Sequence, residues 1–122
     1  IAKPANNEIW YTSTDGNIVE PYKTNVFGAN IVSNTYEEGK GIIKFDGNVT
    51  TIGDYAFFYC RSLTSVTIPN GVTHIGKSAF HYCFDMTNVV IPNSVREIGD
   101  MAFYGCDITN IVIPEGQAYQ SP

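Results

Sequence analysis

Three cysteines and two histidines are the residues of this 122-residue chain that could carry nucleophilic, redox or metal chemistry. Each cysteine ends a similar stretch: "IGDYAFFYC" ends at Cys60, "IGKSAFHYC" at Cys83 and "IGDMAFYGC" at Cys106. A zinc site needs four converging ligands, or three and a water. His81 lies two residues before Cys83, but it should point outward where Cys83 points inward, and His74 belongs to another face. The sequence therefore predicts no metal site, no cofactor and no catalytic residue.

These stretches belong to an internal repeat. Two copies of 23 residues, Ile52 to His74 and Ile75 to Glu97, precede a third, Ile98 to Gly116, that loses one residue. Upstream, residues 42–51 match the latter part of a copy, with Phe45 at an apolar strand position. Self-similarity at a fixed period of roughly 20–50 residues predicts a solenoid, in which each repeat buries its apolar side against its neighbours.

Each copy should contain a strand, a second short extended piece and a turn. The alternation in Val66-Thr67-Ile68 has the period of a strand, and the proline that follows ends it because proline cannot donate to a ladder. The glycine after the second piece allows a sharp turn, from which a single helical or 3-10 turn carries an Ala-Phe pair. Stacked copies lie about 4.8 Å apart. We therefore expect one buried ring stack of Phe57, Phe80 and Phe103.

The three cysteines would then form one row of the interior. Neighbours in such a row lie about 5 Å apart, within disulfide range, but their side-chain vectors run parallel rather than towards each other. Free cysteine packs as a small apolar residue with a weak thiol donor. Buried, reduced thiols are the favoured state, and a disulfide between two of them is the alternative.

The pattern IGxxAFxxCxxLxxVxIPxxV, over residues 42 to about 116, resembles the BspA-like class of leucine-rich repeats. This resemblance implies an α/β fold, a right-handed solenoid with parallel strands and short helical or 3-10 turns. It also implies a secreted or cell-surface bacterial protein that adheres to host matrix proteins, host cells or other bacteria. The family brings no catalytic residues, so we expect a non-enzymatic interaction module.

Residues 1–40 lie outside the repeats and are expected to form a β-hairpin cap on a solenoid of residues 41–122. An Asp15-Gly16 turn lies between two strand-like runs, which is a short-range hairpin signal, and a second hairpin is expected around Glu37 to Gly41. Trp10 is interpreted as a cap residue on the first repeat in preference to a ligand platform.

The ends of the chain lead to further expectations. A start at Ile1 instead of methionine indicates a processed or trimmed product. The residues after Pro114 are too few and too polar for another repeat. We therefore expect either a protein that continues past Pro122, or self-association that covers the open end of the last repeat.

Two surfaces are candidates for binding. The strand face should align Lys44, Ser65, Thr67, Asn88, Val90, Asn110 and Val112, and an ordinary solvated sheet face is an equal alternative. An aromatic row should contain Phe58, Tyr59, His81, Tyr82 and Tyr104, for which packing against a neighbouring copy or the cap is favoured over a sugar platform.

The composition disfavours some classes of partner for this chain. The net charge of −5, with only seven basic residues, disfavours nucleic acid, and no apolar run approaches the roughly 20 residues of a membrane span. The family resemblance, and not the composition, implies a host or microbial surface protein, or a glycan, as the partner. The alternatives are a carbohydrate-binding module that uses the aromatic row, and a structural spacer with no ligand of its own.

Overall fold

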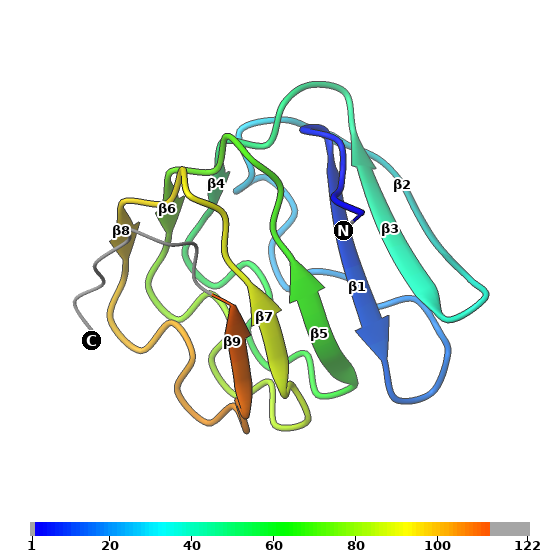
Figure 1. The fold of residues 1–122 in the computed structure, drawn as a ribbon, viewed down its shortest axis with the longest axis vertical. Helices are drawn as coiled ribbons and strands as arrows, with labels where there is room; N and C mark the ends of the chain where they lie inside the picture. Colours follow the sequence, from blue (N-terminus) through cyan, green and yellow to red (C-terminus); the bar gives the residue numbers. More distant parts are fainter. Residues whose placement is uncertain (1, 113–122) are drawn as a thin grey trace.

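The computed structural model describes residues 2–112, which form nine β-strands in two sheets and no helix. Figure 1 shows a larger sheet in the order β2-β3-β1-β5-β7-β9 and a smaller one in the order β4-β6-β8. The strands of the larger sheet are β1 (Glu8–Ser13), β2 (Ile31–Glu37), β3 (Lys40–Phe45), β5 (Leu63–Thr67), β7 (Asn88–Val90) and β9 (Asn110–Val112). Those of the smaller sheet are β4 (Thr51–Ile52), β6 (His74–Ile75) and β8 (Glu97–Ile98).

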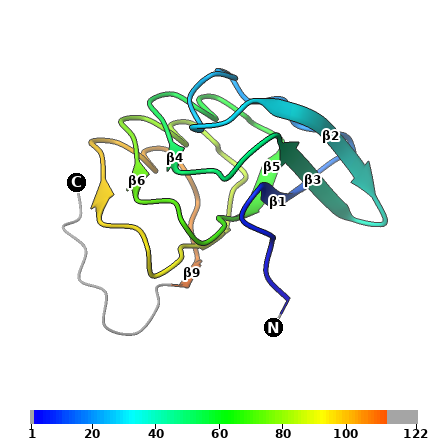
Figure 2. The same ribbon diagram turned by 90° about the horizontal axis from the view of Figure 1, so that it is seen from above.

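The repeats stack on one another in register. In the larger sheet β5, β7 and β9 are parallel, with Val66 opposite Val89 and Val89 opposite Ile111. In the smaller sheet β4, β6 and β8 are also parallel, with Ile52 opposite Ile75. Figure 2 shows successive repeats as nested loops that pass between the two sheets. The period of the sequence therefore predicted the pairing partners of these strands correctly. The end of the last repeat, around Pro114, lies outside the described residues.

Consecutive hydrogen-bonded turns lead from β4 to β5. The Ala56 N–H donates to the Gly53 carbonyl at 3.2 Å, which closes one turn, whereas the Phe57 N–H donates to the Ala79 carbonyl of the next repeat at 2.7 Å. A helix would keep all of these groups within its own segment. Because alternate amides bond to the neighbouring repeat, the expected helical or 3-10 turn does not form in residues 2–112.

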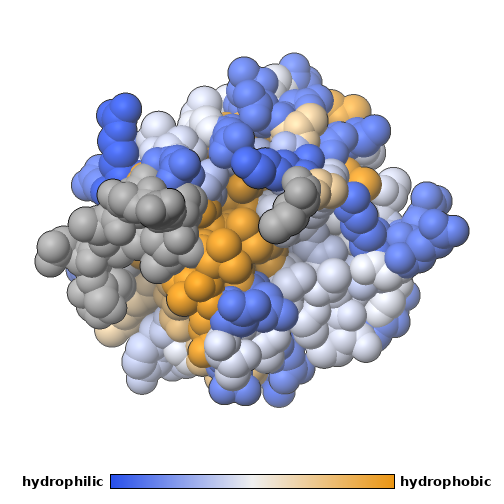
Figure 3. Space-filling view, viewed as in Figure 1, coloured by the Kyte–Doolittle hydropathy of each residue, from blue (hydrophilic) through white to orange (hydrophobic). Residues whose placement is uncertain are grey.

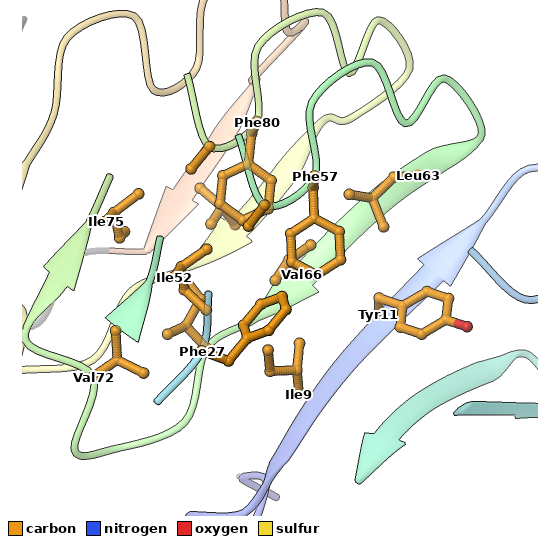
Figure 4. Close-up of a cluster of buried hydrophobic side chains, with 14 of the residues drawn as sticks. Ile9, Tyr11, Phe27, Ile52, Phe57, Leu63, Val66, Val72, Ile75 and Phe80 are labelled. Atoms are coloured by element: carbon orange, nitrogen blue, oxygen red, sulfur yellow. The ribbon is translucent and has the colours of Figure 1, made fainter. Parts of the chain in front are cut away.

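The expected phenylalanine stack is confirmed. The rings of Phe57 and Phe80 are 5.3 Å apart and nearly parallel, at 6°, and those of Phe80 and Phe103 are 5.3 Å apart at 2°. Phe57 and Phe80 are fully buried, and Phe103, at the end of the stack, is partly exposed. Phe27 closes the other end, with its ring 5.8 Å from that of Phe57 (Figure 4).

The second predicted hairpin is confirmed and the first is wrong. Strands β2 and β3 are joined at Glu38 and Gly39, whose φ angles of 52° and 79° suit a two-residue turn. Strand β1 is antiparallel to both β3 and β5 and lies between them. After the Asp15-Gly16 turn, no strand forms before Ile31.

Side chains replace the missing strand. The Val19 N–H donates to the Tyr11 hydroxyl at 3.0 Å, and the Asn34 side-chain amide donates to the Val19 carbonyl at 2.9 Å. Pro21 follows and cannot donate to a ladder. The backbone N–H and carbonyl of Val19 are therefore satisfied without a hairpin partner.

Residues 22–28 cover the first repeat. The Gly53 N–H donates to the Val26 carbonyl at 2.8 Å, and the Thr50 N–H donates to the Phe27 carbonyl at 3.1 Å. This segment carries the buried ring of Phe27, which closes the core. Phe27 therefore closes the end of the core, whereas Trp10, which was expected to cap the first repeat, lies beside Thr67 of that repeat in the neighbouring strand β1.

Candidate interaction surfaces

The two histidines lie apart and make short-range contacts. His74 Nε2 is 2.6 Å from a Glu97 carboxylate oxygen, in an exposed pair on the smaller sheet. His81 Nδ1 is 2.9 Å from the Ser78 hydroxyl. Within residues 2–112, no three His, Cys, Asp or Glu side chains are placed to hold a metal ion. These contacts can anchor the side chains, but they do not converge on a common reaction centre.

The three cysteines are free, and each thiol contacts a backbone carbonyl. The Sγ atoms of Cys83 and Cys106 are 3.0 Å from the carbonyl oxygens of Phe57 and Phe80, one repeat earlier. Cys83 is buried, but Cys60 and Cys106 are only half-buried because they end the row. The expectation of three buried thiols is therefore wrong at both ends.

Two of the three thiols, those of Cys60 and Cys83, are poor nucleophiles, whereas hydrogen bonding with the Cys83 thiol lowers the pKa of Cys106. Burial raises the pKa of Cys60 to about 11. The neighbouring Cys106 thiol and burial together raise the pKa of Cys83 above its ordinary value. Since the thiolate is the reactive form, the two thiols serve as interior hydrogen-bonding groups instead of redox groups.

The outer face of the larger sheet carries two aligned rows across β5, β7 and β9. Their registers confirm the predicted alignment of Ser65, Asn88 and Asn110, and of Thr67, Val90 and Val112. Val112 is 46% exposed and Val90 is half-buried. Figure 3, which looks onto this face, shows a hydrophobic patch over β7 and β9. The alignment is an observation, and its use in binding stays a prediction.

Lys44 does not extend the row of Thr67. Strand β1 lies between β3 and β5. Lys44 pairs with Glu8 of β1, whereas Thr67 pairs with Trp10, two residues further along the same strand. The Lys44 ammonium is 4.0 Å from the Glu8 carboxylate. The predicted position of Lys44 is therefore wrong, because an antiparallel strand separates it from the repeats.

Trp10 takes that place in the outer row, a position that was not predicted from the sequence. It pairs with Thr67 on one side and with Ile42 on the other. Its indole N–H donates to a Glu8 carboxylate oxygen at 2.9 Å, and the Lys40 ammonium lies 3.2 Å from its ring centre. Along "EIWYTS" the side chains alternate between the two faces of the sheet, so Trp10 lies on the other face from the buried Ile9 and Tyr11. This alternation could have revealed the outward position of Trp10 from the sequence. A shallow groove of about 290 Å³ beside it is lined by residues that include Trp10, Thr12, Lys40, Ser65 and Thr67.

The predicted aromatic row also exists. The Phe58 and His81 rings are 5.4 Å apart, those of His81 and Tyr104 5.0 Å, and those of Tyr59 and Tyr82 5.9 Å. Tyr59 and Tyr104 are 51% and 54% exposed. His81 Nε2 is buried among these rings and has no hydrogen-bond partner. Phe58, His81 and Tyr82 are half-buried by contacts between successive repeats, as expected, whereas the rings of Tyr59 and Tyr104 remain largely exposed.

Three neighbours of this row were missed. Phe84 stacks on Tyr82 at 5.3 Å and 19°. The Arg61 guanidinium lies 5.7 Å from the centre of the Tyr59 ring and 5.5 Å from that of Phe84, and Tyr22 of the covering segment meets Phe58 edge-on at 5.2 Å. Arg61 and Phe84 follow successive cysteines, so the repeat alignment could have paired them. We call this surface the aromatic patch: Tyr22, Phe58, Tyr59, His81, Tyr82, Phe84 and Tyr104, with Arg61 at its margin.

Parallel strands stacked at the sequence period, with a free sheet face on one side and turns on the other, define a leucine-rich repeat protein. The profile of the BspA type leucine-rich repeat region (6 copies) matches residues 21–120, and the chain belongs to this family. Residues 2–112 contain no helix with the length and apolarity of a membrane span.

Among solved structures, the chain is similar to a leucine-rich repeat protein from Bacteroides ovatus ATCC 8483, with 32% identity over 73% of this chain and 27% of that one, and a TM-score of 0.46. It is also similar to a leucine rich cell surface protein from Faecalibacterium prausnitzii A2-165, with 26% identity over 91% of this chain and 32% of that one, and a TM-score of 0.46. The chain thus spans a third or less of either protein. A search of curated proteins finds no match.

Proposed function

We propose that this chain is a non-enzymatic adhesion module of a secreted or cell-surface bacterial protein, and that it binds a host or microbial surface protein. In this proposal the repeats form a right-handed solenoid whose outer sheet face is the binding surface. Membership of the BspA-type family supports the proposal. The family contributes no catalytic residues, and the described histidines and thiols make local contacts only.

The observation that carries the proposal is the aligned, uncharged character of the sheet face. Asn88 and Asn110 form an amide row beside the half-exposed Val90 and Val112. Protein interfaces have cores that are depleted of charge and enriched in aromatic residues, with a polar rim. Trp10 adds an aromatic residue at the edge of the same face. A shallow face of this kind favours a macromolecular partner over a small molecule enclosed in a pocket.

Charges placed on the apolar row test this proposal. In the variant Val90→Asp with Val112→Asp, the carboxylates can stay hydrated in the free protein but must lose water on binding. We expect at least about tenfold weaker binding of the labelled chain to fixed epithelial or bacterial cells, equivalent to about 1.4 kcal/mol. Because Val90 and Val112 pair across β7 and β9, the two carboxylates repel each other and should lower stability by about 1 kcal/mol, so binding is compared well below the unfolding temperature of the double variant.

Val32→Asp is the matched control. Val32 is 66% exposed on β2, outside the aligned rows, so this variant should bind like the unmodified chain. Unchanged binding of the double variant, or equal loss in the control, would contradict the use of the sheet face. If the unmodified chain binds neither cell type, the spacer role is favoured.

A carbohydrate-binding role is the second candidate. The observation that favours it is the exposure of Tyr59 and Tyr104 within an extended group of rings. Aromatic residues with an apolar face and a polar tip suit ligands that combine both properties.

A further inference from the structure

The aromatic patch contains tyrosines at backbone positions that suit glycine. Tyr59 and Tyr82 have φ angles of 59° and 63°, and the equivalent residue of the third repeat is Gly105, with φ 83°. A residue with a Cβ in this left-handed region costs about 1–2 kcal/mol. Glycine at 59 and 82 would therefore relieve backbone strain in the first two repeats.

The rings at these positions contribute to an exposed surface. Tyr59 is 51% exposed, and Phe84 beside it is 40% exposed. Because so much of the Tyr59 ring faces solvent, the burial of this ring offsets the strain only in part. Positive φ angles also recur at Tyr55, Ser78 and Met101, one in each repeat, so the strain belongs to the turns of the repeat, and the exposed rings at 59 and 84 are the feature particular to this patch.

A second, independent feature lies beneath the rings. His81 Nε2 is buried and without a hydrogen-bond partner, while His81 Nδ1 is 2.9 Å from the Ser78 hydroxyl. Unsatisfied buried polar atoms are uncommon in folded proteins and frequently mark functional sites. The strained tyrosines and this nitrogen belong to the same ring cluster, in which His81 and Tyr82 are 4.2 Å apart.

We propose that the aromatic patch binds an oligosaccharide chain that runs across the repeats. Tyr59 and Phe84 offer ring surface to the C–H faces of successive sugars, and Arg61 and the tyrosine hydroxyls offer hydrogen bonds to sugar hydroxyls. Ring pairs of successive repeats lie 5.0–5.9 Å apart, which is close to the length of one sugar unit in an extended chain. This inference deepens the carbohydrate-binding candidate and does not depend on the sheet face.

Charge and shape favour a neutral sugar chain over a protein segment. In the described part of the chain, residues 2–112, Arg61 is the cation that lies over the patch rings, 5.7 Å from the centre of the Tyr59 ring and 5.5 Å from that of Phe84. Stacking on separate exposed rings suits a chain of repeated units, because each sugar can bind without a broad complementary surface.

Titration of the full chain with cellohexaose, laminarihexaose, chitohexaose and mannohexaose tests the proposal. Tyr59→Gly removes one ring and suits the local φ, so this variant should stay folded. We expect at least one sugar to bind with a dissociation constant in the micromolar to millimolar range. Tyr59→Gly and Phe84→Ala should each weaken the binding of that sugar by about tenfold. The variant Val90→Asp with Val112→Asp should bind the sugar normally, and the fluorescence of Trp10 on the sheet face should not change.

The results separate the two proposals. If none of the four sugars binds, or if Tyr59→Gly binds them as tightly as the unmodified chain, the oligosaccharide proposal is wrong and the sheet-face proposal is untouched. If the sheet variant loses sugar binding while Tyr59→Gly retains it, the sugar site lies on the sheet. If Tyr59→Gly weakens cell binding but no sugar binds, the patch recognises a protein and the oligosaccharide proposal is wrong.

Discussion

Phe80→Ala should cost this fold more stability than Phe103→Ala, which truncates the ring at the end of the stack. Phe80 is fully buried and lies 5.3 Å from a parallel ring on each side. Replacement of a buried phenylalanine by alanine costs about 3–5 kcal/mol, from lost burial and from the cavity that remains. Phe103 is partly exposed and has a parallel ring on one side in the described chain, so Phe103→Ala should cost about half as much.

The expected loss of stability can be compared with the total stability of the domain. At about 0.05–0.15 kcal/mol per residue, a chain of this length has a stability of about 6–18 kcal/mol. Phe80→Ala would remove a large part of the lower value, while Phe80→Leu keeps most of the volume and should cost less. Urea unfolding followed by circular dichroism measures the change, and an unchanged slope shows that the comparison is valid. A loss below about 1 kcal/mol, or an equal loss in Phe103→Ala, would refute the packing argument.

Two further predictions concern the turns and the thiols. Gly105→Ala should lower stability by about 1–2 kcal/mol, because φ at this residue is 83° and the new Cβ would lie 2.7 Å from the Tyr82 ring. A double-mutant cycle with Tyr82→Ala should show a smaller loss when the ring is absent. An unchanged loss would exclude the ring contact as a cause. The folded state keeps the Cys60 proton up to about pH 11, whereas an unfolded thiol loses it near 8.5. The difference in unfolding free energy between the unmodified chain and Cys60→Ala should therefore be largest below about pH 8.5 and should fall by about 2–3 kcal/mol as the pH rises through 11. A difference that does not depend on pH would contradict the raised pKa of this thiol.

The repeated part of the fold was predictable from sequence because stacking is a nearest-neighbour property. Once copies of 23 residues are aligned, the period itself brings Phe57 against Phe80 and Asn88 against Asn110. Each contact in such an array joins one repeat to the next. The same alignment should have included Arg61 and Phe84, which occupy equivalent positions.

The N-terminal segment was not predictable in this way because its pairings are long-range. Strand β1 pairs with β3 and β5, and Trp10 lies opposite Thr67. A local turn signal at Asp15-Gly16 says nothing about such partners. The prediction of a helical turn was wrong for a related reason, since the amides of Phe57 and its equivalents donate to carbonyls of the next repeat.

The insertion of β1 changes what the N-terminal segment contributes. If β3 had stacked directly on β5 as another repeat strand, Lys44 would have bounded the outer row with a charge. Instead Trp10 stands level with Thr67, and Lys44 is paired with Glu8 one strand further away. The uncharged row of the repeats therefore continues into an aromatic residue held by Glu8 and Lys40. Residues 22–28 cover the end of the core, and β1 extends the outer face, so the segment before the repeats belongs both to the stability of the domain and to its candidate binding surface.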